Sequence, residues 1–211
     1  MFERFTASFR LSPAGQSPVE PFRGDRPLAV AGFDELMAAA AGCTFDDGLY
    51  RLHSASTGRI GQDHADATFP QHRGRMTVFA FDWLGRQFAL DAGRVQGSEP
   101  LVLLLEPGSG EALEIPVTFA AFHDEELVDY RNEALASDFF AEWAASHRGD
   151  VPLELSQCVG YEVPLFLGGQ DTVGNLELTD FDVCWSFAAQ LRAQTRSRPD
   201  GTPIGGVGSD G

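Results

Sequence analysis

Residues 75–91 read RMTVFAFDWLGRQFALD, and they contain the strongest structural signal in the chain. Residues 75–81 are rich in apolar and β-branched side chains, which is typical of a buried strand. Residues 82–85, DWLG, form a four-residue turn in which Gly85 is free to adopt a positive φ. Because residues 86–91 then return as a partner strand, the segment predicts an antiparallel hairpin.

Two more strands are predicted after this hairpin. Residues 101–106, LVLLLE, are continuously apolar, as expected of a strand that is covered on both faces. Residues 112–117 follow a PGSG turn and alternate between apolar and polar side chains. Proline cannot donate a hydrogen bond to a neighbouring strand, so Pro116 predicts an edge strand or a strand end. The positions expected to point inward are Leu113, Ile115 and Val117.

Helical periodicity is found on both sides of these strands. Residues 33–40 place apolar side chains at helical spacing and stop before Gly42, and residues 54–70 give a weaker helical signal. Later in the chain, Asn132 and Asp180 can each cap a helix. The expected buried positions are Leu135, Phe139 and Trp143 in the first of these helices, and Cys184, Phe187, Ala188 and Leu191 in the second.

Strands come early in this order and helices come late, with a further short strand expected at 48–53. Such an arrangement predicts an α+β fold, with a mainly antiparallel sheet and helices packed on one face. We expect an irregular N-terminal arm over residues 1–30, because this segment contains four prolines. Residues 31–198 are expected to form a single α+β domain, and the Gly/Pro-rich residues 199–211 to form a flexible C-terminal tail.

The net charge is strongly negative and unevenly distributed. The 211-residue chain has 15 basic and 31 acidic residues, and residues 101–190 contain 17 Asp and Glu against two Arg. Such a field repels nucleic acid and anionic lipid and attracts a basic protein partner. The alternative is that the acidic surface only keeps the protein soluble.

The chain shows no signature of membrane insertion, secretion or a disulfide framework. No run of 18 apolar residues is present, and Glu3, Arg4 and Arg10 interrupt the apolar core that a signal peptide needs. The three cysteines are widely spaced, which argues against a disulfide framework and a paired-cysteine zinc site. We therefore expect a cytoplasmic protein.

No catalytic, cofactor or metal motif emerges from the polar residues. HDEE at 123–126 and DHAD at 63–66 have metal-ligand residue types, but adjacent helical positions point in different directions. The glycines of 167–175 lack the following Lys-Ser or Lys-Thr of a phosphate loop. Cys158 and Cys184 are expected to be packed thiols. We therefore expect no enzyme, no cofactor and no metal, although spacing alone leaves an acid/base carboxylate pair open.

Two stretches of the chain together resemble a known bacterial family. They are GLYRLH with FDWLGRQFALD, and CVGYEVPLFLGGQDTVGNLELTDFDVCW at 158–185. The family is related to type VI secretion immunity proteins, within the SUKH-like immunity and cell-wall-regulator group, and the resemblance spans about residues 48–204. It implies an α+β protein that binds and neutralises a cognate toxin, often a nuclease. The family usually has an aromatic directly before the tryptophan and a cysteine-glycine pair in the last helix, where this chain has Cys184 and Ala188-Ala189.

Residues 158–185 are interpreted mostly as turns and caps. Tyr161 and residues 164–166 are expected to form a buried extended segment, after which Gly168 and Gly169 turn the chain. Asn175 can close that turn by bonding its own backbone. The residues expected to be structural are Trp83, Gly85, Tyr161, Pro164, Gly168, Gly169, Asn175, Asp180 and Trp185.

The remaining carboxylates are candidates for binding a partner. One predicted acidic patch comprises Asp124, Glu125, Glu126 and Asp129, and another comprises Asp171, Glu177 and Asp182. The sequence therefore predicts a non-catalytic immunity protein that occludes a basic toxin, possibly a nuclease. The alternatives are an adaptor or scaffold in a secretion or defence locus, and a carboxylate-dependent hydrolase.

Overall fold

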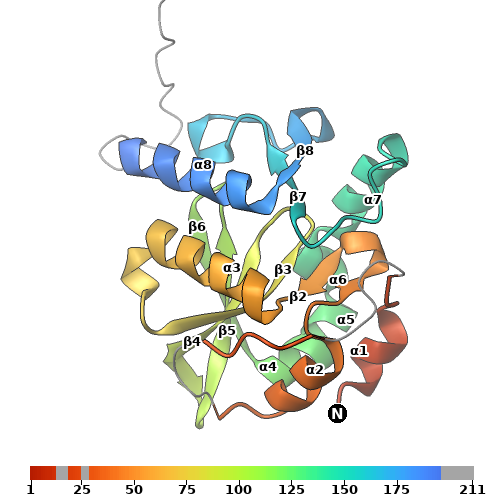
Figure 1. The fold of residues 1–211 in the computed structure, drawn as a ribbon, viewed down its shortest axis with the longest axis vertical. Coiled ribbons are helices and arrows are strands. Elements are labelled where there is room, and N and C mark those ends of the chain that lie inside the picture. The colour runs from red at the N-terminus through yellow and green to blue at the C-terminus, as the bar shows by residue number, and fades with distance from the viewer. Residues whose placement is uncertain (13–18, 25–28, 196–211) are drawn as a thin grey trace, which may run out of the picture.

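The computed structural model describes residues 1–12, 19–24 and 29–195, and it has an α+β fold (Figure 1). Six antiparallel strands form one sheet whose spatial order follows the order of the sequence. These strands are β1 (Thr44–Phe45), β2 (Tyr50–Leu52), β3 (Met76–Asp82), β4 (Gln87–Gln96), β5 (Glu99–Glu106) and β6 (Glu111–Thr118). A second, two-stranded antiparallel sheet comprises β7 (Gln157–Tyr161) and β8 (Leu176–Asp180). The expected fold class is confirmed.

The helices precede, interrupt and follow the strands. They are α1 (Glu3–Ser8), α2 (Phe33–Ala40), α3 (Ala55–Thr68), α4 (Phe119–Ala121), α5 (Leu127–Asp129), α6 (Arg131–Leu135), α7 (Ser137–Ser146) and α8 (Phe181–Thr195). The segment Phe122–Glu126 is a π-helical turn, and single 3₁₀ turns lie at Asp46–Gly48, Pro70–His72, Leu165–Leu167 and Val173–Asn175. Within the described residues, no helix combines the length and the apolar character needed to cross a bilayer.

The predicted hairpin is formed by β3 and β4. Met76 pairs with Asp91 at one end and Phe81 pairs with Gln87 at the other. Gly85 adopts a φ of 73°, as expected for the turn. The Asp82 carboxylate accepts hydrogen bonds from the backbone N–H groups of Leu84 and Arg86, so the first residue of the turn also holds its closing residues.

The six-stranded sheet is covered by helices on both faces, whereas the sequence predicted helices on one face only. Side chains of β5 alternate between two cores, with Val102 and Leu104 in one and Leu103 and Leu105 in the other. The first core also contains residues of α1, α2, α4 and α7, and the second contains residues of α3 and α8 (Figure 1). The continuous apolar run of β5 is therefore explained by burial on both sides.

The N-terminal segment differs from the irregular arm predicted over residues 1–30. Residues 3–8 form α1, and Phe2, Phe5 and Phe9 are buried in the first core. The Phe5 and Phe9 rings stack with centroids 4.8 Å apart. These phenylalanines are spaced i, i+3 and i+7, which is helical spacing, so the signal was present in the sequence. The predicted flexible tail, 199–211, and residues 196–198 of the predicted domain lie outside the described residues.

The helix predicted from Asn132 is two helices in the structure. Ala136 adopts a left-handed conformation with a φ of 49°, which separates α6 from α7. The Asn132 side chain accepts a hydrogen bond from the backbone N–H of Asp138, 2.9 Å away, so it caps the second helix across the break. Leu135 and Trp143 are buried as expected, and Phe139 is partly buried.

Pro116 lies in β6, which is an edge strand of the six-stranded sheet, as predicted. Leu113 in the same strand is 43% exposed, in contrast to the inward position predicted for it. An edge strand is covered incompletely, so alternation of apolar residues does not by itself ensure burial.

A buried arginine connects the large sheet to the C-terminal segments. The Arg51 guanidinium donates hydrogen bonds to the backbone carbonyls of Asp82, Glu154 and Gln157, and it lies 4.2 Å from the centroid of the Phe81 ring. Burial lowers the pKa of Arg51 to about 10, which leaves the group charged at neutral pH.

The β3–β4 turn is a docking point for three other segments. The indole N–H of Trp83 donates to the carbonyl of Leu135 at 2.9 Å, and its backbone carbonyl accepts from the N–H of Val159 at 2.7 Å. The indole N–H of Trp185 in α8 donates to the carbonyl of Gly85 at 2.8 Å. Both tryptophans are fully buried, as predicted.

We predict that Trp143→Ala and Trp185→Ala each lower the free energy of unfolding by about 3–5 kcal/mol, because both side chains are fully buried and truncation leaves a cavity. Val183→Ala is the matched control in α8, since Val183 is 57% exposed and exposed substitutions change stability by about 0.5 kcal/mol or less. Urea denaturation provides the measurement. An unchanged midpoint in either tryptophan variant would contradict this assignment.

Candidate functional site

The first predicted acidic patch is largely used inside the fold. Asp124 accepts hydrogen bonds from the backbone N–H groups of Arg4 and Phe5, at 3.0 and 3.1 Å. Asp129 forms a two-point ion pair with the Arg4 guanidinium, at 3.0 and 2.5 Å. Both carboxylates therefore hold α1 against the π-helical turn and α5, and this pairing was not foreseen because the N-terminus was expected to be irregular.

The other two members of this patch differ from each other. Glu125 is exposed, whereas Glu126 is partly buried. Burial raises the pKa of Glu126, and the nearby Glu133 carboxylate raises it further. The four residues therefore do not form one free acidic surface, because Asp124 and Asp129 are engaged by α1.

His123, which begins the HDEE motif, is buried in the aromatic core. Its Nδ1 lies 2.9 Å from the carbonyl oxygen of Phe119, and its Nε2 lies 2.9 Å from the hydroxyl of Tyr50. A carbonyl only accepts hydrogen bonds, so Nδ1–H donates and Nε2 accepts from Tyr50. Burial lowers the pKa of His123 to about 4, which keeps the ring neutral at neutral pH.

The second predicted patch is divided between two cavities. Glu177 lines the first cavity. Asp171 accepts a hydrogen bond at 2.7 Å from the hydroxyl of Tyr161, and Tyr161 also lines this cavity. Asp182 lines the second cavity and lies 2.6 Å from His64 Nε2.

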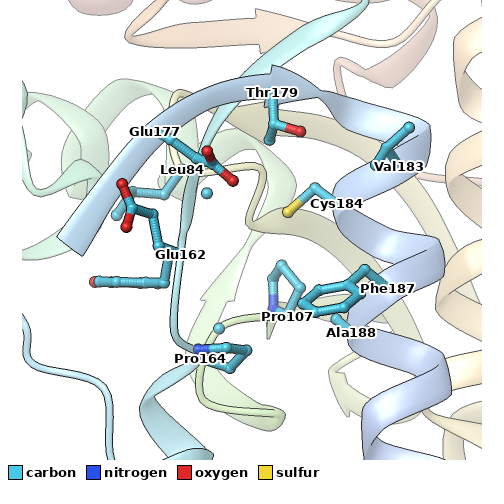
Figure 2. A pocket seen from close by; sticks show the side chains of 13 residues that line it. Leu84, Pro107, Glu162, Pro164, Glu177, Thr179, Val183, Cys184, Phe187 and Ala188 are labelled. Atoms are coloured by element: carbon cyan, nitrogen blue, oxygen red, sulfur yellow. The ribbon is translucent and has the colours of Figure 1, made fainter. Parts of the chain in front are cut away.

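The first cavity lies between β7, β8, the N-terminal half of α8 and the turn that joins β5 to β6, and we call it the hairpin–helix pocket (Figure 2). Its volume is about 260 Å³. Its lining includes Tyr161, Glu162, Glu177, Val183, Cys184 and Phe187.

Local sequence features build each wall of this pocket. Asp180 accepts hydrogen bonds from the backbone N–H groups of Asp182 and Val183, as predicted for a helix cap, and this starts α8. Gly108 lies in the β5–β6 turn, and a Cβ atom there would come within 2.6 Å of the Tyr161 ring. Glycine is therefore needed at 108 for the tyrosine to pack against the turn.

The loop between β7 and β8 is held by Asn175, but not as predicted. Its side chain bonds both the N–H and the carbonyl of Val163, and also the carbonyl of Gln170, so it bridges the loop instead of bonding its own backbone. A Cβ atom at Gly169 would lie 1.8 Å from the Val163 carbonyl oxygen, and Gly168 has a φ of 89°, so the predicted sharp turn is confirmed.

The expected extended segment over 164–166 is not extended throughout. Leu165–Leu167 is a 3₁₀ turn, although Pro164 and Phe166 are buried. Tyr161 is partly buried and lines the pocket, so it contributes to the candidate site as well as having the structural role predicted for it. Burial raises the pKa of Tyr161, and its hydrogen bond to Asp171 raises it further, so the hydroxyl remains a donor at neutral pH.

The pocket has an acidic side and an apolar side. Figure 2 shows Glu162 and Glu177 on the hairpin side, with Phe187 across from them on α8. Within the part of the chain that the structure describes, none of the ion pairs involves Glu162 or Glu177. Phe187 and Val183 are 49% and 57% exposed, in contrast to the buried position predicted for Phe187.

The two cysteines near the pocket differ in their surroundings. Cys158 is buried, whereas Cys184 is only partly buried and lines the pocket. A hydrogen bond with Cys184 and burial both raise the pKa of Cys158, so this thiol stays protonated at neutral pH. The packing predicted for Cys158 is confirmed, and Cys184 lies at the border between core and pocket.

The second cavity has a volume of about 340 Å³ and lies near the starts of α3 and α8. Several of its polar groups already have internal partners, although the exposed Glu154 carboxylate is in none of the ion pairs of the described residues. His53 Nε2 lies 3.2 Å from the Gln87 side-chain oxygen, and burial lowers the pKa of His53 to about 3. Asp180 caps α8, and Asp182 contacts His64. We therefore place the candidate site in the hairpin–helix pocket, where two carboxylates, Glu162 and Glu177, take part in none of the ion pairs of the described residues and lie across from the half-exposed Phe187.

Sequence reasoning missed three residues of this site, Glu162, Val183 and Phe187. Val183 and Phe187 are spaced i and i+4, which was a detectable sign of a second apolar stripe on α8. Glu162 carried no comparable signal, because its position depends on how β7 pairs with β8.

Comparisons with known proteins support the fold alone. No protein-family model matches the chain, and no curated protein matches its sequence. Among solved structures, the chain is similar to the crystal structure of Atu4351 from Agrobacterium tumefaciens, with a TM-score of 0.59 and 13% sequence identity. The similarity covers 90% of this chain and 89% of that chain.

We predict that the purified protein contains no stoichiometric Zn, Mg or Ca. Among the described residues, no group of three or more His, Cys, Asp and Glu side chains is placed to hold a metal ion. Elemental analysis of the purified protein checks this, and one tightly held ion per chain would contradict it.

We predict that stability falls on acidification because His53 and His123 are buried and neutral. Their pKa values are lowered to about 3 and about 4, against about 6.5 in an unfolded chain. Below about pH 6.5 the unfolded chain therefore binds more protons, so the free energy of unfolding decreases between about pH 6.5 and 4.

His123→Gln tests this directly, because glutamine retains hydrogen-bonding capacity but does not titrate. Urea denaturation at pH 6 and pH 5 gives the free energy of unfolding at each pH. Its change per pH unit should be smaller in the variant than in the wild type by about 1 kcal/mol. Equal slopes in both proteins would mean that His123 is not a buried neutral group.

Proposed function

We propose that this protein is a non-catalytic binding protein of the immunity class, which neutralises a basic toxin by occlusion. The hairpin–helix pocket and its rim would form the centre of the binding surface. The proposal combines the sequence resemblance to immunity proteins with the chemistry of this surface.

The observation that carries the proposal is that exposed apolar side chains lie at the same pocket as two carboxylates that form no ion pair with any described residue. Phe187 and Val183 lie one turn apart on α8 and together expose apolar surface at the rim of the pocket. Glu162 and Glu177 lie beside them without ion pairs among the described residues. An aromatic anchor with charged groups at its edge is the composition that protein interfaces favour.

The charge distribution supports a basic partner. Residues 101–190 contain 17 acidic and two basic residues, a formal charge of −15, and they include nearly all of the pocket. A field of one sign accelerates the approach of an oppositely charged protein. Nucleases present basic surfaces to phosphate groups, so a nuclease toxin would fit this charge.

One observation also favours the carboxylate-dependent hydrolase as a second candidate. Glu162 and Glu177 line the same pocket, and a pair of carboxyl groups in one site is the catalytic equipment of glycosidases. Hydrolysis of chromogenic glycosides by the wild-type protein, lost in Glu177→Gln, would favour this reading over occlusion. An adaptor would use the same surface without inhibiting its partner.

We predict that Glu162→Gln/Glu177→Gln slows association with the basic toxin, which we expect to be encoded by a neighbouring gene. Removing two rim charges should lower the association rate about three- to tenfold at low salt and flatten its dependence on salt concentration, because steering is electrostatic. Stopped-flow measurements across a range of salt concentrations give both quantities.

Asp124→Asn/Asp129→Asn is the matched control, because it removes the same charge from the other predicted patch. It should reduce stability by releasing Arg4, but it should leave the association rate of the folded protein unchanged. Equal slowing by both double variants would mean that net charge, and not this pocket, governs binding. If neither double variant lowers the association rate and both are folded, acidic steering does not contribute to binding.

A further inference from the structure

We infer that the hairpin–helix pocket is a receptor for a guanidinium group and binds a single arginine side chain. The inference rests on the proposed function for the source of that arginine, which is the surface of the basic partner. The chemistry of the pocket itself can be tested without any partner.

The size of the pocket restricts its occupant. Its volume of about 260 Å³ is below the range of about 300–1,000 Å³ that is usual for pockets of drug-sized ligands. It therefore fits one long side chain, and the rest of a partner would lie over the exposed rim.

The two carboxylates project from the same face of the β7–β8 hairpin. Glu177 pairs with Gly160 across the two strands, and Glu162 lies two residues beyond Gly160, so strand alternation places both on one side. A Cβ atom at Gly160, opposite Glu177, would lie 3.2 Å from the methyl group of Thr179 and 3.3 Å from Cys184 Sγ, so glycine at this position lets α8 lie close to the hairpin. The backbone of Glu162 is held by a hydrogen bond from its N–H to the Asn175 carbonyl, at 2.9 Å.

The opposite wall offers an aromatic surface. Phe187 is about half exposed and faces the carboxylate side across the pocket, with Val183 one turn earlier in α8 (Figure 2). A planar cation can stack on such a ring while its N–H groups reach the carboxylates, and the apolar stem of the same side chain can cover Val183.

This geometry favours arginine over lysine and over a metal ion. Guanidinium is planar, weakly hydrated and able to donate several hydrogen bonds in one plane, whereas an ammonium is compact and strongly hydrated. A metal ion would need a larger set of converging ligands, and the described residues contain no such group.

The test uses the intact chain and two small probes, N-acetyl-arginine amide and N-acetyl-lysine amide, at constant ionic strength. Two-dimensional amide NMR reports where each probe binds and how tightly. We expect shifts to concentrate at Gly160, Glu162, Val183 and Phe187, and the arginine probe to bind at least about threefold more tightly than the lysine probe.

Three variants separate the contributions. Glu162→Gln/Glu177→Gln should weaken binding of the arginine probe by about tenfold or more. Phe187→Leu keeps apolar bulk but removes the aromatic face, so it should reduce the preference for arginine over lysine. Glu125→Gln/Glu142→Gln removes two exposed carboxylates elsewhere and should leave binding unchanged.

The outcomes distinguish this inference from the proposed function. Shifts outside the pocket, equal binding of both probes, or unchanged binding in Glu162→Gln/Glu177→Gln would overturn the guanidinium site, even if the basic protein still binds. A different result separates the two: the wild type binds the arginine probe at the pocket, and Glu162→Gln/Glu177→Gln still binds the basic protein normally. This result would support the guanidinium site and overturn the proposed binding surface.

Discussion

The hydrogen-bonded turn at residues 82–85 is the constraint on which the rest of the structure depends. Asp82 holds the turn through two backbone N–H groups and pairs with the Arg86 side chain at 2.6 Å, while its carbonyl accepts from Arg51. A buried charge is costly unless it is paired and hydrogen-bonded. Because Asp82, Arg51 and Arg86 are all buried, the turn is stable only with its partners in place.

The same turn positions the pocket, although the pocket lies mainly in other elements. The carbonyls of Trp83 and Gly85 anchor Val159 in β7 and Trp185 in α8, respectively. The two opposing walls are thus fixed to residues of a single turn. A preformed cavity loses less conformational entropy on binding than one that must be assembled, which is the basis of preorganisation.

Acidic residues in this chain serve two different purposes, which their net charge does not reveal. Asp124 and Asp129 fasten the N-terminal helix through Arg4, and Asp180 caps α8. Glu162 and Glu177 have no such role among the described ion pairs and line a pocket instead. A carboxylate has a structural role where the folded chain places a cation or a backbone N–H group within hydrogen-bonding distance of it.

Local patterns in the sequence were sufficient for the elements whose signals are short-range. Turn chemistry, strand periodicity and proline geometry act between near neighbours, so they can be identified in a short window of sequence. They predicted the β3–β4 hairpin, the positive φ of Gly85, the edge position of β6, the capping role of Asp180 and the burial of the tryptophans. The α+β class follows from the order of these elements.

Tertiary structure decided what depends on contacts between distant segments. Helices on both sheet faces and the break at Ala136 follow from packing that no local window contains. The pocket depends on the pairing of Gly160 with Glu177 and on α8 crossing the hairpin, which brings Phe187 opposite Glu162. A sequence pattern indicates which side chains are apolar or charged, but exposure and pairing are properties of the assembled surfaces, and only the folded chain specifies them.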